Sequence, residues 1–152
     1  ERGIIEPKAT FSACFGEPFM LLNPVVYAKL LGEKINDCNT EVYLINTGWI
    51  GGGYGTGKRV NLSYTREMVN AVINDKFKDI DFYEQPVFKL FIPSECPNVP
   101  SEILNPRDLW ENKEEYDDNA KKLAENFDEN FKKFKNVSED IAYAGINYSV
   151  IL

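Results

Sequence analysis

Six of the ten residues from Gly48 to Gly57 are glycine, and this stretch constrains the fold more than any other. Because glycine has no Cβ, it tolerates backbone conformations with positive φ that other residues resist. A run this dense favours neither a helix nor a strand, so we expect a loop. The elements on either side are therefore separate, and the chain turns between them.

The segments that flank the glycine loop predict a strand before it and a helix after it. Residues 42–45 form a short, β-rich apolar run with little alternation, typical of a central, parallel strand covered on both faces. After an extended stretch at 60–62, Ser63 or Thr65 would cap a helix that ends near Lys76. The buried face of this helix is expected to carry Met68, Val69, Val72 and Ile73.

The rest of the chain predicts further helices and a pair of strands. Asn23 followed by Pro24 is typical of a helix start, and the apolar spacing that follows predicts a helix over 24–37, preceded by an irregular loop. The other expected elements are paired strands at 82–84 and 87–92, an amphipathic helix over 113–135 that starts at Asn112, and a short helix around 139–144. We therefore expect an α/β fold in one domain.

Composition narrows the function classes. The 152 residues are 43% hydrophobic and 13% aromatic, which indicates a globular domain. A net charge of −7 disfavours nucleic acid and anionic membranes as partners, and no apolar run approaches the ~18 residues of a membrane span. The three cysteines lack C-x-x-C spacing and histidine is absent, so we expect a cytoplasmic protein without a Ser–His or Cys–His nucleophile.

The segment from Gly52 to Lys58 has the G-x-x-x-x-G-K spacing of a phosphate-binding loop. The next residue is Arg59, where such loops carry Ser or Thr to bind Mg²⁺, and an extended stretch replaces the expected helix. A true phosphate loop is therefore disfavoured. Two interpretations remain open: an edge whose guanidinium contacts the base, ribose or phosphate of a nucleotide, or a flexible surface loop with solvated cations.

Two further features have structural explanations. The acidic residues at 111, 114, 115, 117 and 118 are dense enough for a metal patch, but acids are favoured at the start of a helix by its dipole. Cys14 lies in a run of small residues, and no imidazole is available to activate it. We expect helix-start acids in the first case and a buried, inert thiol in the second.

Three segments of the chain resemble the C-terminal part of the ATP-dependent phosphoenolpyruvate carboxykinases. They are residues 1–24, which contain TFSACFG, residues 42–73, which contain NTGW and GTGKR, and residues 96–110. The likeness extends to about Phe134. There are two departures: Asn23 stands where the family usually has histidine, and YAGINYSVIL is unlike the family's usual ending.

The resemblance implies a carboxy-lyase of gluconeogenesis that decarboxylates oxaloacetate and phosphorylates the product with ATP, giving phosphoenolpyruvate, CO₂ and ADP. It also implies Mg²⁺ on the nucleotide and Mn²⁺ at the active site, with the phosphate loop and metal ligands upstream of Glu1. By match to the family motif, Arg59, Val60 and Thr65 would be the nucleotide contacts. No catalytic residue or metal ligand is expected within this chain.

The resemblance further implies that residues 1–152 are the C-terminal portion of one nucleotide-binding domain, a mixed sheet with packed helices, truncated upstream of Glu1. Such a portion is expected to leave apolar surface bare and to self-associate through residues 42–45 or 87–92. The alternative is a non-catalytic nucleotide-binding or regulatory module, and a third interpretation treats the glycine loop as a mere turn.

Overall fold

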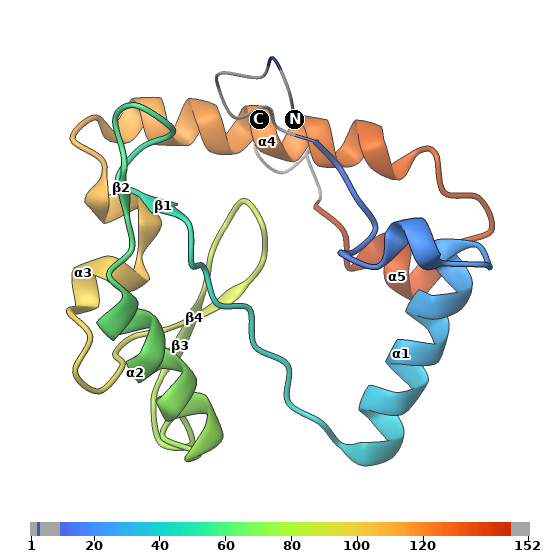
Figure 1. The fold of residues 1–152 in the computed structure, drawn as a ribbon, viewed down its shortest axis with the longest axis horizontal. Helices are drawn as coiled ribbons and strands as arrows, with labels where there is room; N and C mark the ends of the chain where they lie inside the picture. The colour runs from blue at the N-terminus through green and yellow to red at the C-terminus, as the bar shows by residue number, and fades with distance from the viewer. Residues whose placement is uncertain (1–2, 4–9, 147–152) are drawn as a thin grey trace. The chain divides into compact units, whose positions relative to one another are not determined.

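The computed structural model of the chain describes Gly3 and residues 10–146 (Figure 1). These residues form two compact units. One comprises the described residues up to Val42 together with Glu129–Ala144, and the other comprises Tyr43–Asp128 with Gly145 and Ile146. No helix in the described ranges is both long and apolar enough to cross a bilayer.

The first unit is helical. It contains the 3₁₀ helix η1 (Glu17–Phe19), α1 (Pro24–Cys38) and α5 (Glu139–Tyr143). The side chain of Asn23 caps α1 by accepting a hydrogen bond from the Val25 amide at 3.0 Å. The predictions of a helix over 24–37 and of a short helix around 139–144 are confirmed.

The turn before η1 is held by polar contacts. The Glu17 carboxylate accepts hydrogen bonds from the Ser12 hydroxyl at 2.5 Å and the Ala13 amide at 2.9 Å. These bonds, first that of Ser12, lower the pKa of Glu17. Cys14 lies in this turn and is exposed, so the expectation of a buried thiol is wrong. The turn is held by hydrogen bonds among small polar groups, and it does not bury the sulfur.

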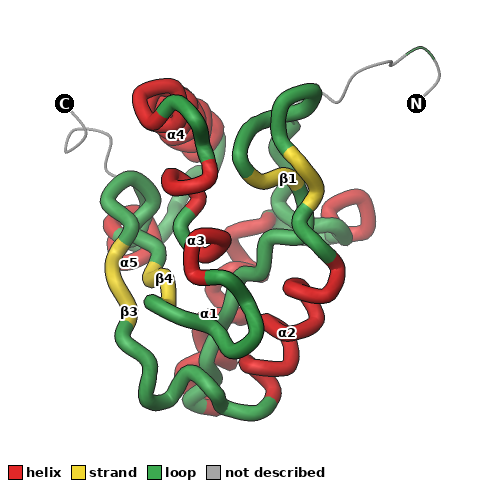
Figure 2. Tube along the Cα trace, turned by 90° about the vertical axis from the view of Figure 1, so that its left-hand side faces the viewer, coloured by secondary structure: helices red, strands yellow, loops and turns green. Residues whose placement is uncertain are grey.

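The strands of the second unit form two separate antiparallel pairs (Figure 2). β1 (Trp49–Ile50) pairs with β2 (Lys58–Arg59), and β3 (Phe82–Glu84) pairs with β4 (Phe91–Pro93). Helices and strands are thus combined, as an α/β fold requires. The expected mixed sheet, however, is not formed by the part of the chain that the structure describes.

The predicted parallel strand at 42–45 is wrong. The segment is not paired in a sheet, and Leu44 is 79% exposed. Tyr43 instead packs on Phe77, with ring centroids 5.8 Å apart. An apolar run forms a strand only when a neighbouring strand supplies backbone hydrogen bonds, and in the described structure residues 42–45 have no such neighbour.

The core of the second unit lies between α2 (Leu62–Ile73) and the segments that follow it. Its buried members are Ala71, Phe77, Cys96 and Val99, with Tyr43, Tyr64, Met68, Val72, Ile80, Ile103 and Leu104 packed against them. Burial, and secondarily the nearby Glu67, raises the pKa of the Cys96 thiol. Cys96 is buried, whereas Cys14 and Cys38 are exposed.

α2 starts differently from the prediction. Its cap is Asn61, whose side chain accepts hydrogen bonds from the amide and hydroxyl of Ser63, both at 3.0 Å. Met68 and Val72 pack against the core as expected, but Val69 and Ile73 are 40% and 72% exposed. The apolar face of α2 therefore extends beyond the part that packs against the core.

The second strand pair confirms β3 but shortens its partner. Residues 86–88 form a turn, in which the Gln85 side chain accepts hydrogen bonds from the amides of Val87 at 2.9 Å and Phe88 at 2.6 Å. Lys89 has a φ of +54°. The ladder therefore begins at Phe91 rather than at Val87.

Two short helices lead into the long one. α3 (Ser101–Leu104) and the 3₁₀ helix η2 (Pro106–Leu109) precede α4 (Lys113–Phe131). Asn112 caps α4 by accepting from the amides of Glu114 at 3.0 Å and Glu115 at 3.2 Å. The start of the helix and its acidic first turn are confirmed, whereas its end was predicted four residues too late.

Candidate functional site

The glycine stretch forms the connection of a β-hairpin. Trp49 lies opposite Arg59 and Ile50 opposite Lys58 in the β1–β2 register, and the Val60 amide donates to the Gly48 carbonyl at 3.0 Å. The chain therefore returns into a second strand before α2 begins. A phosphate-binding loop would pass directly from strand to helix, which agrees with the prediction against one.

The connection is folded on itself. The amides of Thr56 and Gly57 donate to the Gly53 carbonyl at 3.3 and 2.8 Å, so these two amides are engaged within the loop. A Cβ added to Gly57 would lie 2.2 Å from the Gly52 carbonyl oxygen. Gly52 itself has a φ of +148°. Glycine is thus required here by close backbone approach.

Arg59 lies over an aromatic ring. Its guanidinium carbon is 5.7 Å from the centroid of the Trp49 ring, within the range of a cation–π interaction. Tyr54 meets the same indole edge to face, with centroids 5.8 Å apart and planes at 88°. Arg59 and Lys58 are both exposed, so two cations lie at the surface of β2.

Val60 and Thr65 lie just beyond Arg59. Val60 is 8% exposed, and its amide is engaged by Gly48, so a nucleotide contact that preserves this bond would use its carbonyl oxygen. Thr65 is half-buried in the first turn of α2, where its amide donates to the Asn61 carbonyl at 3.2 Å. The three predicted site residues thus belong to one strand-to-helix junction.

Two further residues shape this junction and were missed from the sequence. Asn46 accepts from the Gly48 amide at 2.8 Å and donates to the Trp49 carbonyl at 3.3 Å, which fixes the entry to β1. Trp49 supplies the ring beneath Arg59. The Asn-x-Gly spacing signals the first as an Asx turn, whereas the second emerges only from the hairpin register.

Three of the acidic residues at the start of α4 have structural explanations. Glu114 and Glu115 lie in the first turn, and Asp117 pairs with Arg107. Across Gly3 and residues 10–146, no three Cys, Asp or Glu side chains approach one another as metal ligands would. The described residues therefore do not fit a metal site.

Comparison with known proteins gives the family. A family model described as phosphoenolpyruvate carboxykinase matches residues 1–102. Phosphoenolpyruvate carboxykinase (ATP) of Caldanaerobacter subterraneus subsp. tengcongensis is 60% identical over 145 residues, which cover 95% of this chain and 28% of that protein. The chain therefore belongs to the ATP-dependent phosphoenolpyruvate carboxykinase family.

Other relatives give the same result. The proteins of the same name from Alkaliphilus oremlandii and Fusobacterium nucleatum subsp. nucleatum are 57% and 55% identical, over 93% and 98% of this chain. They are matched over 27% and 29% of their own length. The chain thus spans little more than a quarter of the curated relatives it matches.

Proposed function

We propose that this chain is the C-terminal, nucleoside-contacting portion of an ATP-dependent phosphoenolpyruvate carboxykinase. The longer enzyme would convert oxaloacetate and ATP into phosphoenolpyruvate, CO₂ and ADP in gluconeogenesis. Family membership supports the reaction. The observation that carries the local assignment is Arg59, exposed on β2 and stacked over Trp49.

Each predicted contact has a distinct chemical role. The guanidinium of Arg59 has a planar face for the base and N–H donors for ribose or phosphate oxygens. The Val60 carbonyl would accept a hydrogen bond, since its amide is engaged by Gly48. The Thr65 hydroxyl would contact the edge of the adenine. Lys58 adds a second cation that favours a phosphate chain.

Mg²⁺ on the nucleotide and Mn²⁺ at the active site belong to the same proposal. Such ions would neutralise charge that develops on phosphate and enolate oxygens. Because the described residues do not fit a metal site, we propose that the ligands lie in parts of the longer enzyme outside this chain. The chain's own contribution is to bind and orient the nucleoside. A cytoplasmic location is part of this proposal.

Replacement of Arg59 tests the assignment. In a full-length enzyme that carries this chain, Arg59→Ala should raise the KM for ATP about tenfold to a hundredfold, because a contact of a charged group away from the reacting atoms contributes on the order of 1.5–3 kcal/mol. The KM for oxaloacetate should change little. Lys76→Ala removes an exposed cation beyond the end of α2 and is the matched control.

The opposite result has a clear meaning. If Arg59→Ala weakened oxaloacetate and left ATP kinetics unchanged, the nucleotide assignment would be wrong. If the full-length protein bound ATP without forming phosphoenolpyruvate, the non-catalytic binding module would be the better description.

A further inference from the structure

The glycine hairpin lies directly against the backbone of η2. Gly51 has a φ of +70°, and a Cβ added to it would lie 3.0 Å from the Leu109 carbonyl oxygen. Leu109 is the last residue of η2. The two backbones therefore approach as closely as a glycine allows, and the position of η2 limits where the hairpin can lie.

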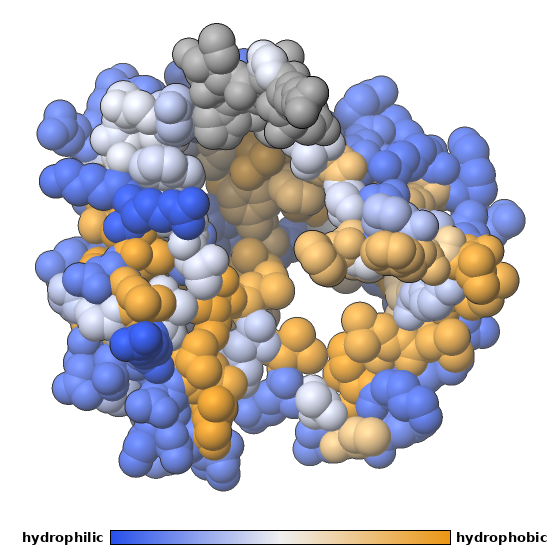
Figure 3. Space-filling model, in the orientation of Figure 1, coloured by the Kyte–Doolittle hydropathy of each residue, from blue (hydrophilic) through white to orange (hydrophobic). Residues whose placement is uncertain are grey.

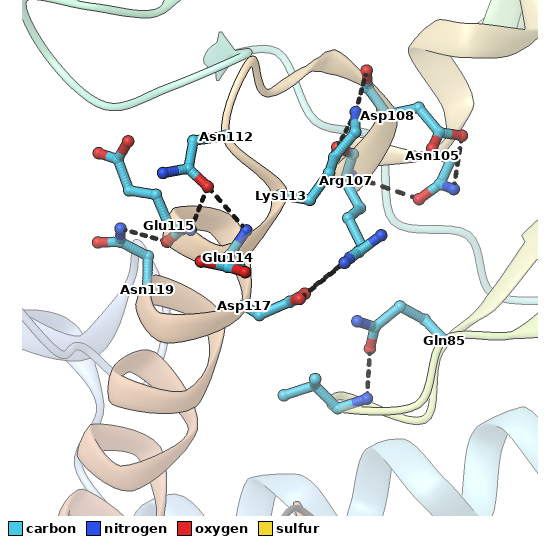
Figure 4. A network of polar contacts seen from close by, with 11 residues as sticks. Gln85, Asn105, Arg107, Asp108, Asn112, Lys113, Glu114, Glu115, Asp117 and Asn119 are labelled. Atoms are coloured by element: carbon cyan, nitrogen blue, oxygen red, sulfur yellow. Dashed lines mark hydrogen bonds and ion pairs between the residues drawn. The ribbon is translucent and has the colours of Figure 1, made fainter.

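η2 is in turn anchored to α4 by side chains. Arg107 donates from Nε and Nη2 to the two carboxylate oxygens of Asp117, both at 2.8 Å (Figure 4). Lys113 Nζ donates to the carbonyl oxygens of Arg107 at 2.9 Å and Asp108 at 2.7 Å. Two cations, one on η2 and one on α4, thus hold the same short helix.

This anchoring is more than a surface ion pair. The Arg107 and Asp117 side chains are 46% and 50% exposed, so their attraction alone contributes little to stability. The bidentate geometry, however, fixes direction as well as distance. A 3₁₀ helix of four residues has little stability of its own, so its position depends on these contacts.

The β1–β2 hairpin depends on contacts with η2 to keep its orientation. Each of its strands has two residues, and the connection between them is rich in glycine, so the pair cannot hold its orientation by its ladder alone. Arg59 lies on β2, directly opposite Trp49. A shift of the connection near Gly51 would be passed to the guanidinium through this ladder.

We propose that Arg107, Lys113 and Asp117, here called the η2 clamp, are positioning residues for the nucleotide contact at Arg59. The clamp holds η2 on α4, and the Leu109 carbonyl then holds the hairpin at Gly51. This inference rests on the proposed function, because it assumes that Arg59 contacts the nucleotide. None of the three residues need touch the nucleotide itself.

Charge reversal tests the clamp. In the full-length enzyme, Arg107→Asp or Asp117→Arg should each raise the KM for ATP about threefold to tenfold, with the KM for oxaloacetate unchanged within about twofold. The double variant, which restores the pair in reverse, should recover most of the loss. Lys29→Glu with Glu33→Lys reverses an exposed pair on α1 and is the control.

Amide hydrogen exchange in the same variants separates the two proposals. Each single reversal should speed the exchange of the Val60 and Gly57 amides, and the double variant should slow it again. Unchanged exchange, equal losses for ATP and oxaloacetate, or no recovery in the double variant would overturn the clamp. If exchange responds as expected but Arg59→Ala leaves the KM for ATP unchanged, the three residues still hold the hairpin in place, but the nucleotide assignment fails and with it their role in ATP binding.

Discussion

The guanidinium carbon of Arg59 lies 5.7 Å from the centroid of the Trp49 ring, and the two residues are directly opposed in the β1–β2 register. The ring restricts the rotamers of a long side chain that would otherwise move freely in solvent. Trp49 is 40% exposed, so the ring itself is accessible beside the cation. The pair has the composition of a platform for a planar base.

Replacement of Trp49 should therefore weaken ATP binding selectively. An exposed cation–π contact contributes about 0.5–1 kcal/mol, so Trp49→Leu should raise the KM for ATP about twofold to fivefold. Trp49→Phe keeps an aromatic face and should lose less. Steady-state kinetics of both variants checks this, and equal effects of Leu and Phe would show that the ring face is not what matters.

The close approach inside the hairpin gives a second prediction. A Cβ at position 57 would meet the Gly52 carbonyl oxygen at 2.2 Å, so Gly57→Ala must displace the backbone and should destabilise the hairpin by about 1–3 kcal/mol. Gly53→Ala is a matched control, because nothing lies within 4 Å of its added Cβ. Exchange of the Val60 amide should rise in the first variant only; a rise in both would point to loop flexibility instead.

These residues also show what could be predicted from the sequence. The helix over 24–37 was predictable because its cap, Asn23, and its apolar spacing are local signals. The run at 42–45 carries an equally strong local preference for a strand, but a strand forms only with a partner that no local pattern identifies. Sequence periodicity therefore located the helices better than the sheets.

The residues of the candidate site show the same difference between local sequence signals and contacts made by distant segments. A family motif predicts Arg59, Val60 and Thr65 as nucleotide contacts, and the three residues lie at one strand-to-helix junction. Trp49 and Leu109 were not found, because their contacts with Arg59 and Gly51 depend on register and on an approach across 58 residues of chain. Neither leaves a periodic signal in the sequence.

The ion pair of the η2 clamp predicts an acid-dependent loss of stability. Hydrogen bonds from Arg107 lower the pKa of Asp117 below its ordinary value of about 3.9. A lowered folded pKa means that the stabilisation is complete above the unfolded value and is lost as the pH falls through the folded one. The contribution of the pair should thus be fully present at pH 7 and be lost only in acid, as the pH falls below about 4.

The pH dependence of this contribution to stability can be measured by urea unfolding. The wild type and Asp117→Asn are compared at several pH values. The difference between their midpoints should shrink as the solution is acidified, because the wild-type carboxylate becomes neutral as well. Asp118→Asn removes the same charge from the next residue and is the control. A difference that stays constant from neutral pH into acid would mean that Asp117 does not stabilise the fold through its charge.

Both units of the chain leave large apolar side chains exposed. In the first unit, α1 has no buried residue among those described, and Leu30 and Leu31 are 49% and 62% exposed. Apolar side chains lie at the surface over α1 in Figure 3. In the second unit, Phe91 on β4 is 68% exposed. Apolar surfaces of this kind are normally covered, and strand edges invite pairing between copies.

We therefore expect the isolated 152-residue chain to self-associate at micromolar concentration, through α1 and the edge of β4. Sedimentation velocity should show species larger than the monomer, and the paired substitutions Leu30→Lys and Leu31→Lys should reduce them, because charge on the apolar face of α1 opposes its burial. Lys34→Glu on the same helix alters charge without removing apolar surface and is the control. A wild-type chain that sediments as a monomer and unfolds cooperatively would show that these residues need no cover.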